Sequence, residues 1–260
     1  MMKKKLNYGC EGLCAVISGG TSGIGLETAR RLLDDGARVY ILGRSRERGM
    51  QAMHYLHEKT GNNAVYIPCD VTSSAQCAQA VAKVVEKEGQ AAQIDILINS
   101  AGFYNEQRLE QLTDADFDAM MAVNVKGTML LAQAALPYLK NGSTVVNIAS
   151  DAALNGNYGC ALYCASKGAV VAFTRALALD LAPAVRVNCV CPADVDTPLL
   201  AKQLVDADGG YTLADMAAAY PLQRVGRAEE VAHVICSVAS PVNSFMTGSV
   251  VAVDGGITAG

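Results

Sequence analysis

The stretch of sequence that decides the fold is Ser18-Gly19-Gly20-Thr21-Ser22-Gly23-Ile24-Gly25. It lies between a short apolar run at residues 13–18 and an amphipathic pattern at residues 24–35. Glycines without a Cβ atom let the backbone approach a phosphate closely, and the start of a helix offers free N–H groups and the positive end of its dipole. A strand, a glycine turn and a helix in this order predict a dinucleotide-binding site at the first strand of an α/β sheet.

The spacing of these glycines separates the turn from two better-known motifs. From Gly19 it is Gly-x3-Gly-x-Gly, and not the Gly-x-Gly-x-x-Gly of the general dinucleotide fingerprint. Gly20 and Gly25 have P-loop spacing, but Leu26 stands where a P-loop requires lysine. A glycine-rich turn that binds no ligand is the alternative interpretation, and the position of the turn directly after the first strand disfavours it.

Strand and helix patterns alternate along the rest of the chain. Apolar, β-branched runs typical of strands covered on both faces stand at residues 13–18, 38–42, 64–68, 94–98, 144–149, 185–191 and 250–253. Helical patterns stand at residues 24–35, 46–60, 73–88, 114–139, 159–181 and 228–240. The alternation predicts one doubly wound, Rossmann-type α/β domain over residues 1–260, with a seven-stranded parallel sheet and helices on both faces.

Residues 194–222 fit none of the expected strands and interrupt the alternation, as a substrate lid would. Apolar side chains are frequent there and in the segment before Tyr163, with a few polar tips: Leu154, Asn157, Tyr158, Leu199, Leu200, Leu204, Tyr211, Leu213, Met216 and Tyr220. Such a lining suits a bulky hydrophobic alcohol or ketone. The alternative is that these residues only pack the lid onto the core.

Composition excludes several classes of protein. The 260 residues are 51% hydrophobic and 18% charged, with a net charge of -4, so a sizeable core is expected and nucleic-acid binding is not. The lysines at residues 3–5 are expected to form a solvated tail, with no signal peptide and no membrane span. The nine cysteines form no CxxC, which favours small core residues in a reducing cytoplasm over a metal site.

The end of the second expected strand bears on the choice of dinucleotide. An acidic residue there would bind the 2′-hydroxyl of the adenosine ribose and repel a 2′-phosphate. This chain has Leu42-Gly43-Arg44-Ser45-Arg46 instead, and Arg44 could pair with a 2′-phosphate. We therefore expect NADP(H) to be preferred, with NAD(H) possible. Alternatively, Arg44 and Arg46 are ordinary solvated residues at a helix start.

Tyr163 and Lys167 are candidates for proton transfer. They are four residues apart on one expected helix and share a face. A nearby ammonium lowers the pKa of a phenol toward the range in which it exchanges protons with a substrate hydroxyl. Tyr55 and Lys59 have the same spacing, but they lie far from any strand end and are assigned to a surface face.

Two further residues separate the pair at Tyr163 from the pair at Tyr55. Ser150 ends the fifth expected strand, at the carboxyl edge where doubly wound proteins bind ligands. Asn124 lies within an otherwise apolar helical pattern and needs a hydrogen-bond partner. The four residues together indicate an active site.

Further motifs follow the third, fourth and sixth strands: Cys69-Asp70-Val71, Asn99-Ser100-Ala101-Gly102 and Pro192-Ala193-Asp194-Val195-Asp196-Thr197. With residues 222–232, residues 253–256 and the glycine turn, they resemble, in order and over nearly the whole chain, the motifs of the short-chain dehydrogenase/reductase family. Asn124, Ser150, Tyr163 and Lys167 resemble that family's catalytic tetrad in type, order and spacing. Three positions depart from the family pattern: Ser18 replaces Thr, Ser100 replaces Asn, and Ala193 replaces a Gly that could take a positive φ.

The resemblance implies specific roles. Tyr163 would transfer the proton, Lys167 would lower its pKa and bind the nicotinamide ribose, Ser150 would position the substrate oxygen, and Asn124 would hold a water. The implied cofactor contacts are Gly19, Thr21, Ser22, Gly23, Ile24, Gly25, Arg44, Asp70, Val71, Asn99, Ala101, Gly102, Tyr163, Lys167, Pro192, Val195 and Thr197. No metal is expected. The family also implies a homotetramer or homodimer built through the helices that bear Asn124 and Tyr163.

We therefore expect an NAD(P)(H)-dependent oxidoreductase that interconverts a secondary alcohol and a ketone on a hydrophobic substrate, such as a hydroxysteroid or a bile-acid-like molecule. A 3-oxoacyl thioester reductase is the alternative within the same class. A catalytically silent dinucleotide-binding sensor is an alternative from another class, although a sensor has no need of Tyr163 and Lys167. A lyase, epimerase or dehydratase on a related fold would have a longer chain with a separate substrate domain.

Overall fold

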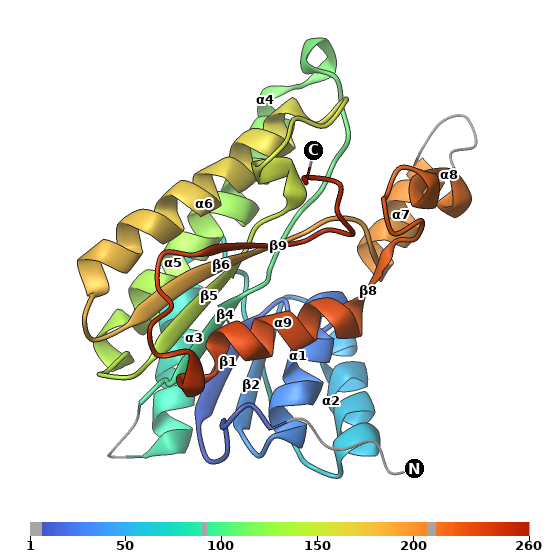
Figure 1. The fold of residues 1–260 in the computed structure, drawn as a ribbon. Helices are drawn as coiled ribbons and strands as arrows, with labels where there is room; N and C mark the ends of the chain where they lie inside the picture. Colours follow the sequence, from blue (N-terminus) through green and yellow to red (C-terminus); the bar gives the residue numbers. More distant parts are fainter. Residues whose placement is uncertain (1–6, 90–92, 207–211, 260) are drawn as a thin grey trace.

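Seven parallel strands form the central sheet of the protein, in the order β3-β2-β1-β4-β5-β6-β9 (Figure 1). The structure is a computed structural model and describes residues 7–89, 93–206 and 212–259. The strands are β1 (Cys14–Ser18), β2 (Arg38–Gly43), β3 (Val65–Pro68), β4 (Ile96–Asn99), β5 (Thr144–Ile148), β6 (Arg186–Pro192) and β9 (Val250–Val253). All seven expected strands are confirmed, with small differences at their ends.

Helices cover both faces of this sheet, which explains why its strands are apolar throughout. One face packs on α1 (Gly23–Asp34), α2 (Arg46–Thr60) and α9 (Ala228–Ala239), and β1 and β4 contribute alternate residues such as Ile17 and Ile98. The other face packs on α3 (Ser74–Glu88), α5 (Gly127–Ala135) and α6 (Ala161–Leu181). β1, β4 and β5 are buried along their whole length. This is the expected doubly wound architecture.

The helical run expected at residues 114–139 is divided into several parts. It consists of α4 (Asp114–Met121), a π-helical turn at Ala122–Lys126, α5, and a 3-10 turn at Leu136–Tyr138. Asn124 lies in the π turn. Such turns interrupt the regular ladder of helical hydrogen bonds and occur frequently at functional sites.

The segment expected to be a strandless lid contains one short strand, so that expectation is wrong in this detail. β7 (Val195–Asp196) pairs in parallel with β8 (Gly226–Arg227), which ties the two ends of the segment together. A two-residue strand is too short for a periodic pattern to reveal. Between the two strands lie α7 (Pro198–Asp206) and α8 (Leu213–Ala218), which project from the body of the domain (Figure 1). Tyr211, expected to line the pocket, lies outside the described residues.

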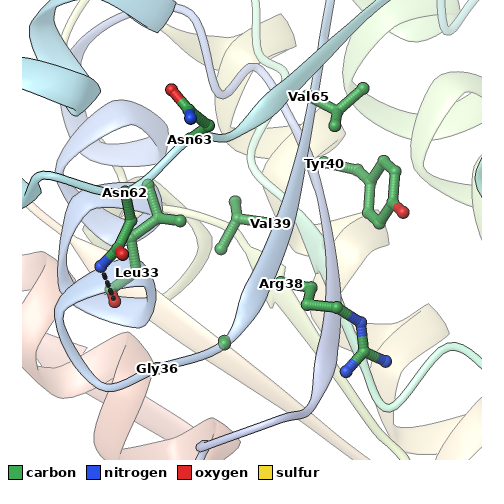
Figure 2. Close-up of a pocket in the computed structure, with 9 residues that line it drawn as sticks. Leu33, Gly36, Arg38, Val39, Tyr40, Asn62, Asn63 and Val65 are labelled. Carbon is green, nitrogen blue, oxygen red and sulfur yellow. Dashed lines mark hydrogen bonds between the residues drawn. The ribbon is translucent and has the colours of Figure 1, made fainter.

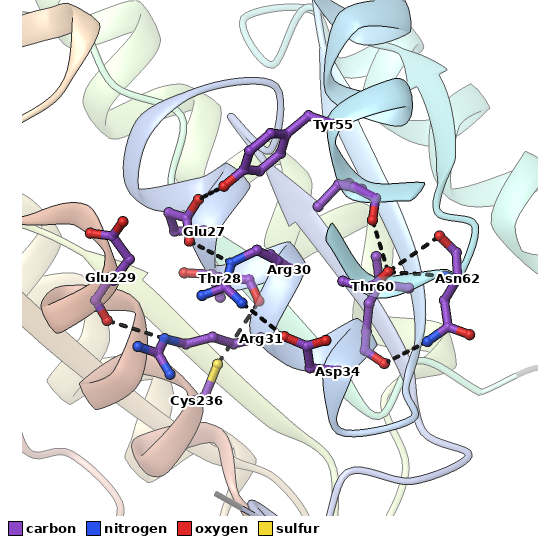
Figure 3. Close-up of polar contacts among 12 residues, drawn as sticks. Glu27, Thr28, Arg30, Arg31, Asp34, Tyr55, Thr60, Asn62, Glu229 and Cys236 are labelled. Carbon is purple, nitrogen blue, oxygen red and sulfur yellow. Dashed lines mark hydrogen bonds and ion pairs between the residues drawn. The ribbon is translucent and has the colours of Figure 1, made fainter. Parts of the chain in front are cut away.

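The second Tyr-x3-Lys pair has a structural role, and its assignment to a surface face is only half correct. Lys59 is exposed, but Tyr55 is half-buried and its hydroxyl donates to Glu27 of α1 (Figure 3). Glu27 also pairs with Arg30 at 2.7 Å. Burial raises the pKa of Tyr55 to about 12, with the hydrogen bond to Glu27 acting in the same direction. This phenol links α2 to α1 and is not a proton-transfer group.

Two helical runs, Asp114–Tyr138 and Ala161–Leu181, are long and apolar enough to cross a membrane by length and composition. Core helices of soluble proteins have the same properties. Residues of both runs, including Leu131 and Ala178, pack into the hydrophobic cluster on one face of the sheet. A cytoplasmic location stays a prediction.

We predict that Leu131→Ala lowers the free energy of unfolding by about 2–5 kcal/mol, because Leu131 is fully buried against the sheet and the truncation leaves a cavity. The corresponding fall in Tm is roughly 10 °C, measured by calorimetry. Leu179→Ala is the matched control, since Leu179 is 81% exposed on α6 and its truncation should have little effect. Equal Tm values for the two variants would contradict this packing.

Candidate active site

The turns after β1 and β4 are in direct contact at the carboxyl edge of the sheet. The Ser18 hydroxyl accepts hydrogen bonds from the backbone N–H groups of Ser100 and Ala101, each at 3.2 Å. Gly19 has a φ of 66°, and a Cβ atom there would lie 2.8 Å from the backbone nitrogen of Ala101. Only glycine fits this contact, and the hydroxyl that Ser18 shares with threonine supplies the hydrogen bonds.

The start of α1 fits a dinucleotide phosphate. Ser22 is its N-cap residue, yet the Ser22 side chain makes no capping hydrogen bond, whereas Ser45 and Ser73 cap α2 and α3. The first N–H groups of α1 are therefore left for an anion. Gly23, with a φ of 53°, approaches Thr197, because a Cβ on Gly23 would lie 3.2 Å from the Thr197 methyl carbon. The glycine turn thus adjoins the beginning of the lid.

The remaining expected cofactor residues lie on the neighbouring strand ends. Arg44 is exposed just before the N-cap of α2, and the adjoining Gly43 lies close to Thr21, since a Cβ on Gly43 would lie 2.8 Å from the Thr21 methyl carbon. The Asp70 carboxylate accepts the backbone N–H of Thr72 at 3.0 Å and its hydroxyl at 2.8 Å.

Other expected cofactor residues are partly engaged within the protein. Val71 packs on Gly127 of α5, where a Cβ would lie 2.7 Å from a Val71 methyl carbon. Asn99 is buried, and its side chain donates to Asn147 at 2.8 Å. Asn147 in turn donates to Thr174 at 2.9 Å. Asn99 therefore connects β4 to β5 and α6. The loop at Ala193 needs no positive φ, so the replacement of glycine there leaves its backbone unstrained.

Tyr163 and Lys167 lie together on α6. The Lys167 ammonium is 5.7 Å from the centre of the Tyr163 ring, and it donates to the backbone carbonyl of Ile148 at 3.1 Å. Gly102 is beside them, because a Cβ on Gly102 would lie 3.7 Å from Lys167 Nζ and 3.8 Å from Asn124 Oδ1. The loop after β4, the π turn and α6 therefore meet at one point.

The Asn124 side chain holds this loop in place. Its Oδ1 accepts the backbone N–H of Phe103 at 2.7 Å, and its Nδ2 donates to the Phe103 carbonyl at 2.9 Å and to Ser166 at 3.0 Å. The expected need for a partner is thus met by Phe103 and Ser166. Asn124 fastens the loop that bears Gly102 to α6.

Burial shifts the pKa values of both proton-transfer candidates. Burial raises the pKa of Tyr163, the Ser150 hydroxyl opposes this through a hydrogen bond, and the negative charges of Asp151 and Asp194 raise the pKa further. Burial also lowers the pKa of Lys167 to about 8. In the protein by itself, therefore, desolvation has the largest effect on the pKa of Tyr163, and the expected lowering by Lys167 stays a prediction.

Two residues beside the tetrad candidates, Tyr104 and Asp151, belong to none of the expected site residues, and Tyr220, expected only to line the pocket, makes a structural contact. Tyr104 packs edge-on against the Tyr163 ring, with centroids 4.8 Å apart, and its hydroxyl accepts from Gln203 of α7 at 3.1 Å. Asp151 accepts the Ser150 hydroxyl at 2.7 Å. Tyr220 donates to Asp194 at 2.7 Å and holds the end of the lid inward. Asp151 directly follows Ser150, and Tyr104 lies two residues after Gly102, but neither belongs to a recognised motif.

Two surface hollows lie at different distances from the carboxyl edge of the sheet. One, of about 380 Å³, lies beside Arg38 and Tyr40 at the opposite end of β2, away from the glycine turn (Figure 2). The other, of about 280 Å³, is lined by Gly23, Leu26, Thr197 and Arg227, and so lies beside the glycine turn and the start of the lid. Ligands of doubly wound sheets bind at the carboxyl edge, which favours the second hollow as part of the site.

We predict that Lys167→Met stabilises the protein at pH 7 and that this advantage shrinks by roughly 3 kcal/mol as the pH rises to about 10. The folded chain releases the Lys167 proton near pH 8, whereas the unfolded chain keeps it to about 10.5. In that window the unfolded state binds more protons, so a rise in pH stabilises the native protein. Urea titrations at each pH measure the difference. Lys140→Met is the control, because Lys140 is exposed, and it should show no such trend. A difference for Lys167→Met that does not change with pH would refute the lowered pKa of Lys167.

Comparison with known proteins identifies the family. Residues 19–258 match a family profile described as enoyl-(acyl carrier protein) reductase. An uncharacterized oxidoreductase of Thermotoga maritima is 36% identical over 253 residues, covering 96% of this chain and 98% of that protein. A 3-oxoacyl-[acyl-carrier-protein] reductase of the same organism is 36% identical over 251 residues, covering 95% and 98%. A Brucella melitensis structure described as short-chain dehydrogenase/reductase SDR:glucose/ribitol dehydrogenase is 34% identical and has a TM-score of 0.88, covering 97% of this chain and 99% of that one. The chain therefore belongs to the short-chain dehydrogenase/reductase family and is an oxidoreductase of the kind that uses NAD(P)(H).

Proposed function

We propose that this chain interconverts a secondary alcohol and a ketone, with Tyr163 as the proton-transfer group. The observation that carries the proposal is the meeting of Tyr163, Lys167, Asn124 and Gly102 at the carboxyl edge of the sheet, beside an uncapped helix start. An enzyme that transfers a hydride from a dinucleotide needs a proton-transfer group, a nearby cation and a phosphate-binding turn close together.

The bound dinucleotide would supply or accept the hydride at the carbinol carbon. Tyr163 removes the hydroxyl proton during oxidation and returns it during reduction. Ser150 contacts the same substrate oxygen and fixes its position. Lys167, held by the carbonyl of Ile148, stabilises the phenolate when it carries its proton. Asn124 acts as a positioning residue, because it holds the loop of Gly102 against α6.

For the substrate, we propose a bulky hydrophobic alcohol or ketone, such as a hydroxysteroid. Among the expected lining residues, Leu154, Leu199 and Leu213 are between 41% and 46% exposed, which supports an apolar surface at the mouth of the site. Leu200 and Met216 are buried and pack the lid itself, as the alternative interpretation holds for them. A 3-oxoacyl thioester is the second candidate, supported by the similarity to the 3-oxoacyl-[acyl-carrier-protein] reductase.

We further propose a homodimer or homotetramer, a preference for NADP(H), and a cytoplasmic location. Ala165, Ala172 and Ala176 are exposed on α6, where small side chains allow a second helix to approach closely. A silent dinucleotide-binding sensor is disfavoured, because it would have no need to bury the Lys167 amine beside a phenol.

We predict that Tyr163→Phe lowers kcat by about a hundred- to ten-thousandfold while cofactor binding stays nearly unchanged, because only the proton-transfer group is lost. Oxidation of NADPH with a panel of ketones, including a steroid and a 3-oxoacyl thioester, measures turnover, and cofactor fluorescence measures binding. Tyr55→Phe is the matched control, since Tyr55 has the same spacing to a lysine but bonds to Glu27. Near-normal turnover by Tyr163→Phe would exclude the role. Cofactor binding by the native protein without turnover would favour the sensor.

We predict that Arg44→Ser raises the KM for NADPH by about tenfold or more and leaves the KM for NADH nearly unchanged, because the lost contact is to the 2′-phosphate. Arg48→Ser is the control, as Arg48 is also exposed but lies in the first turn of α2. A native protein that prefers NADH would show that Arg44 has no such role.

A further inference from the structure

Tyr104 is a half-buried side chain of the site that the proposed mechanism does not use. It lies two residues after Gly102, on the loop after β4, and its ring packs edge-on against the ring of Tyr163 with centroids 4.8 Å apart. Burial raises the pKa of Tyr104, and the hydrogen bond with Cys160 and the negative charge of Glu106 act in the same direction. Tyr104 therefore stays uncharged and is not a second proton-transfer group.

The hydroxyl of Tyr104 joins the loop after β4, the start of α6, and α7. It donates to the Glu106 carboxylate at 3.0 Å and lies 3.3 Å from the Cys160 thiol, at the residue before α6. Glu106 packs on the chain before α6, since a Cβ on Gly159 would lie 3.3 Å from its side chain. From the lid, the Gln203 side chain of α7 donates to the same hydroxyl at 3.1 Å. One hydroxyl thus connects the lid to the body of the domain.

The ring and the hydroxyl of Tyr104 have different consequences. The ring edge restricts the Tyr163 ring, because aromatic pairs in this geometry contribute more than their buried area alone. The hydroxyl holds α7, because movement of α7 away from the site breaks the hydrogen bond from Gln203. We propose that Tyr104 is a positioning residue that orients Tyr163 through its ring and limits the size of the substrate through its hydrogen bond with Gln203. This inference rests on the proposed alcohol–ketone reaction.

The limit on size follows from where this hydrogen bond runs. It joins a residue packed on Tyr163 to a helix of the lid, so a substrate held by Tyr163 meets it on the side of α7. A small ketone binds with the hydrogen bond intact, whereas a bulky ketone has to displace α7 and break it. One hydrogen bond changes an equilibrium constant by about three- to tenfold, and the discrimination between the two ketones should have this size.

Kinetics with a small and a bulky ketone test the limit on size. Tyr104→Phe, which keeps the ring, and Gln203→Met, which keeps the length, should each raise the ratio of kcat/KM for a steroid ketone to that for cyclohexanone by about three- to tenfold. The double variant should change the ratio no further, because both substitutions remove the same bond.

Two matched substitutions are the controls for these kinetics. Tyr138→Phe changes a half-buried tyrosine that adjoins the chain before β4, and Gln79→Met changes an exposed glutamine of α3. Both control variants should keep the native ratio. A ratio that stays native in Tyr104→Phe and in Gln203→Met, or changes that multiply in the double variant, would overturn the limit on size.

The role of the ring is tested by a second substitution at the same position. Tyr104→Leu and Tyr104→Phe lack the same hydroxyl, so a difference between them reports the aromatic edge against Tyr163. Tyr104→Leu should slow hydride transfer by about two- to tenfold relative to Tyr104→Phe, measured in a single turnover with the small ketone. Equal rates in the two variants would overturn the assignment of Tyr104 as a residue that orients Tyr163.

A measurement without turnover separates this inference from the proposed function. Hydrogen exchange followed by mass spectrometry reports how often α7 opens in the protein alone. Tyr104→Phe and Gln203→Met should each raise the exchange rate of the α7 amides by about three- to tenfold, and the double variant no further. Unchanged exchange in both variants would overturn the proposal even if turnover is normal. A native protein that turns over no alcohol or ketone would refute the proposed function, while faster exchange in both variants would still support the link between Tyr104 and α7.

Discussion

The contact between the turns after β1 and β4 is the constraint on which the site depends. Ser18 accepts two backbone N–H groups from the β4 turn, and Gly19 leaves no room for a side chain against Ala101. Parallel strands place all their carboxyl ends at one edge, but they do not by themselves bring two particular loops together. This contact does so, and it thereby sets the position of Gly102 beside Lys167 and Asn124.

Asn124 extends the same constraint to the helices. Its side chain bonds both backbone groups of Phe103, and it reaches Ser166 on α6. Asn124 lies in the π turn between α4 and α5, where the regular helical geometry is interrupted. The loop, the π turn and α6 are thus joined by a single buried amide, so that the positions of Tyr163 and Lys167 follow from those of β1 and β4.

Burial then governs the electrostatics of the site. The Lys167 amine and the Tyr163 phenol both lie where charge is costly, so the pKa of the amine falls and that of the phenol rises. The negative charges of Asp151 and Asp194 raise the pKa of the Tyr163 phenol, as burial does. The protein by itself therefore favours the uncharged phenol.

The sequence by itself determined the seven strands and the two layers of helices, because these depend on apolar periodicity that is local in the chain. It could not determine which side chains meet across the fold. Three contacts join residues far apart in sequence. β7 pairs with β8, Tyr55 bonds to Glu27, and the Tyr104 ring packs against the ring of Tyr163. Asp151 was visible beside Ser150, but its burial and its hydrogen bond from the Ser150 hydroxyl exist only in the folded chain. Burial and long-range contact are properties of the packed structure, and for that reason only the tertiary structure decided them.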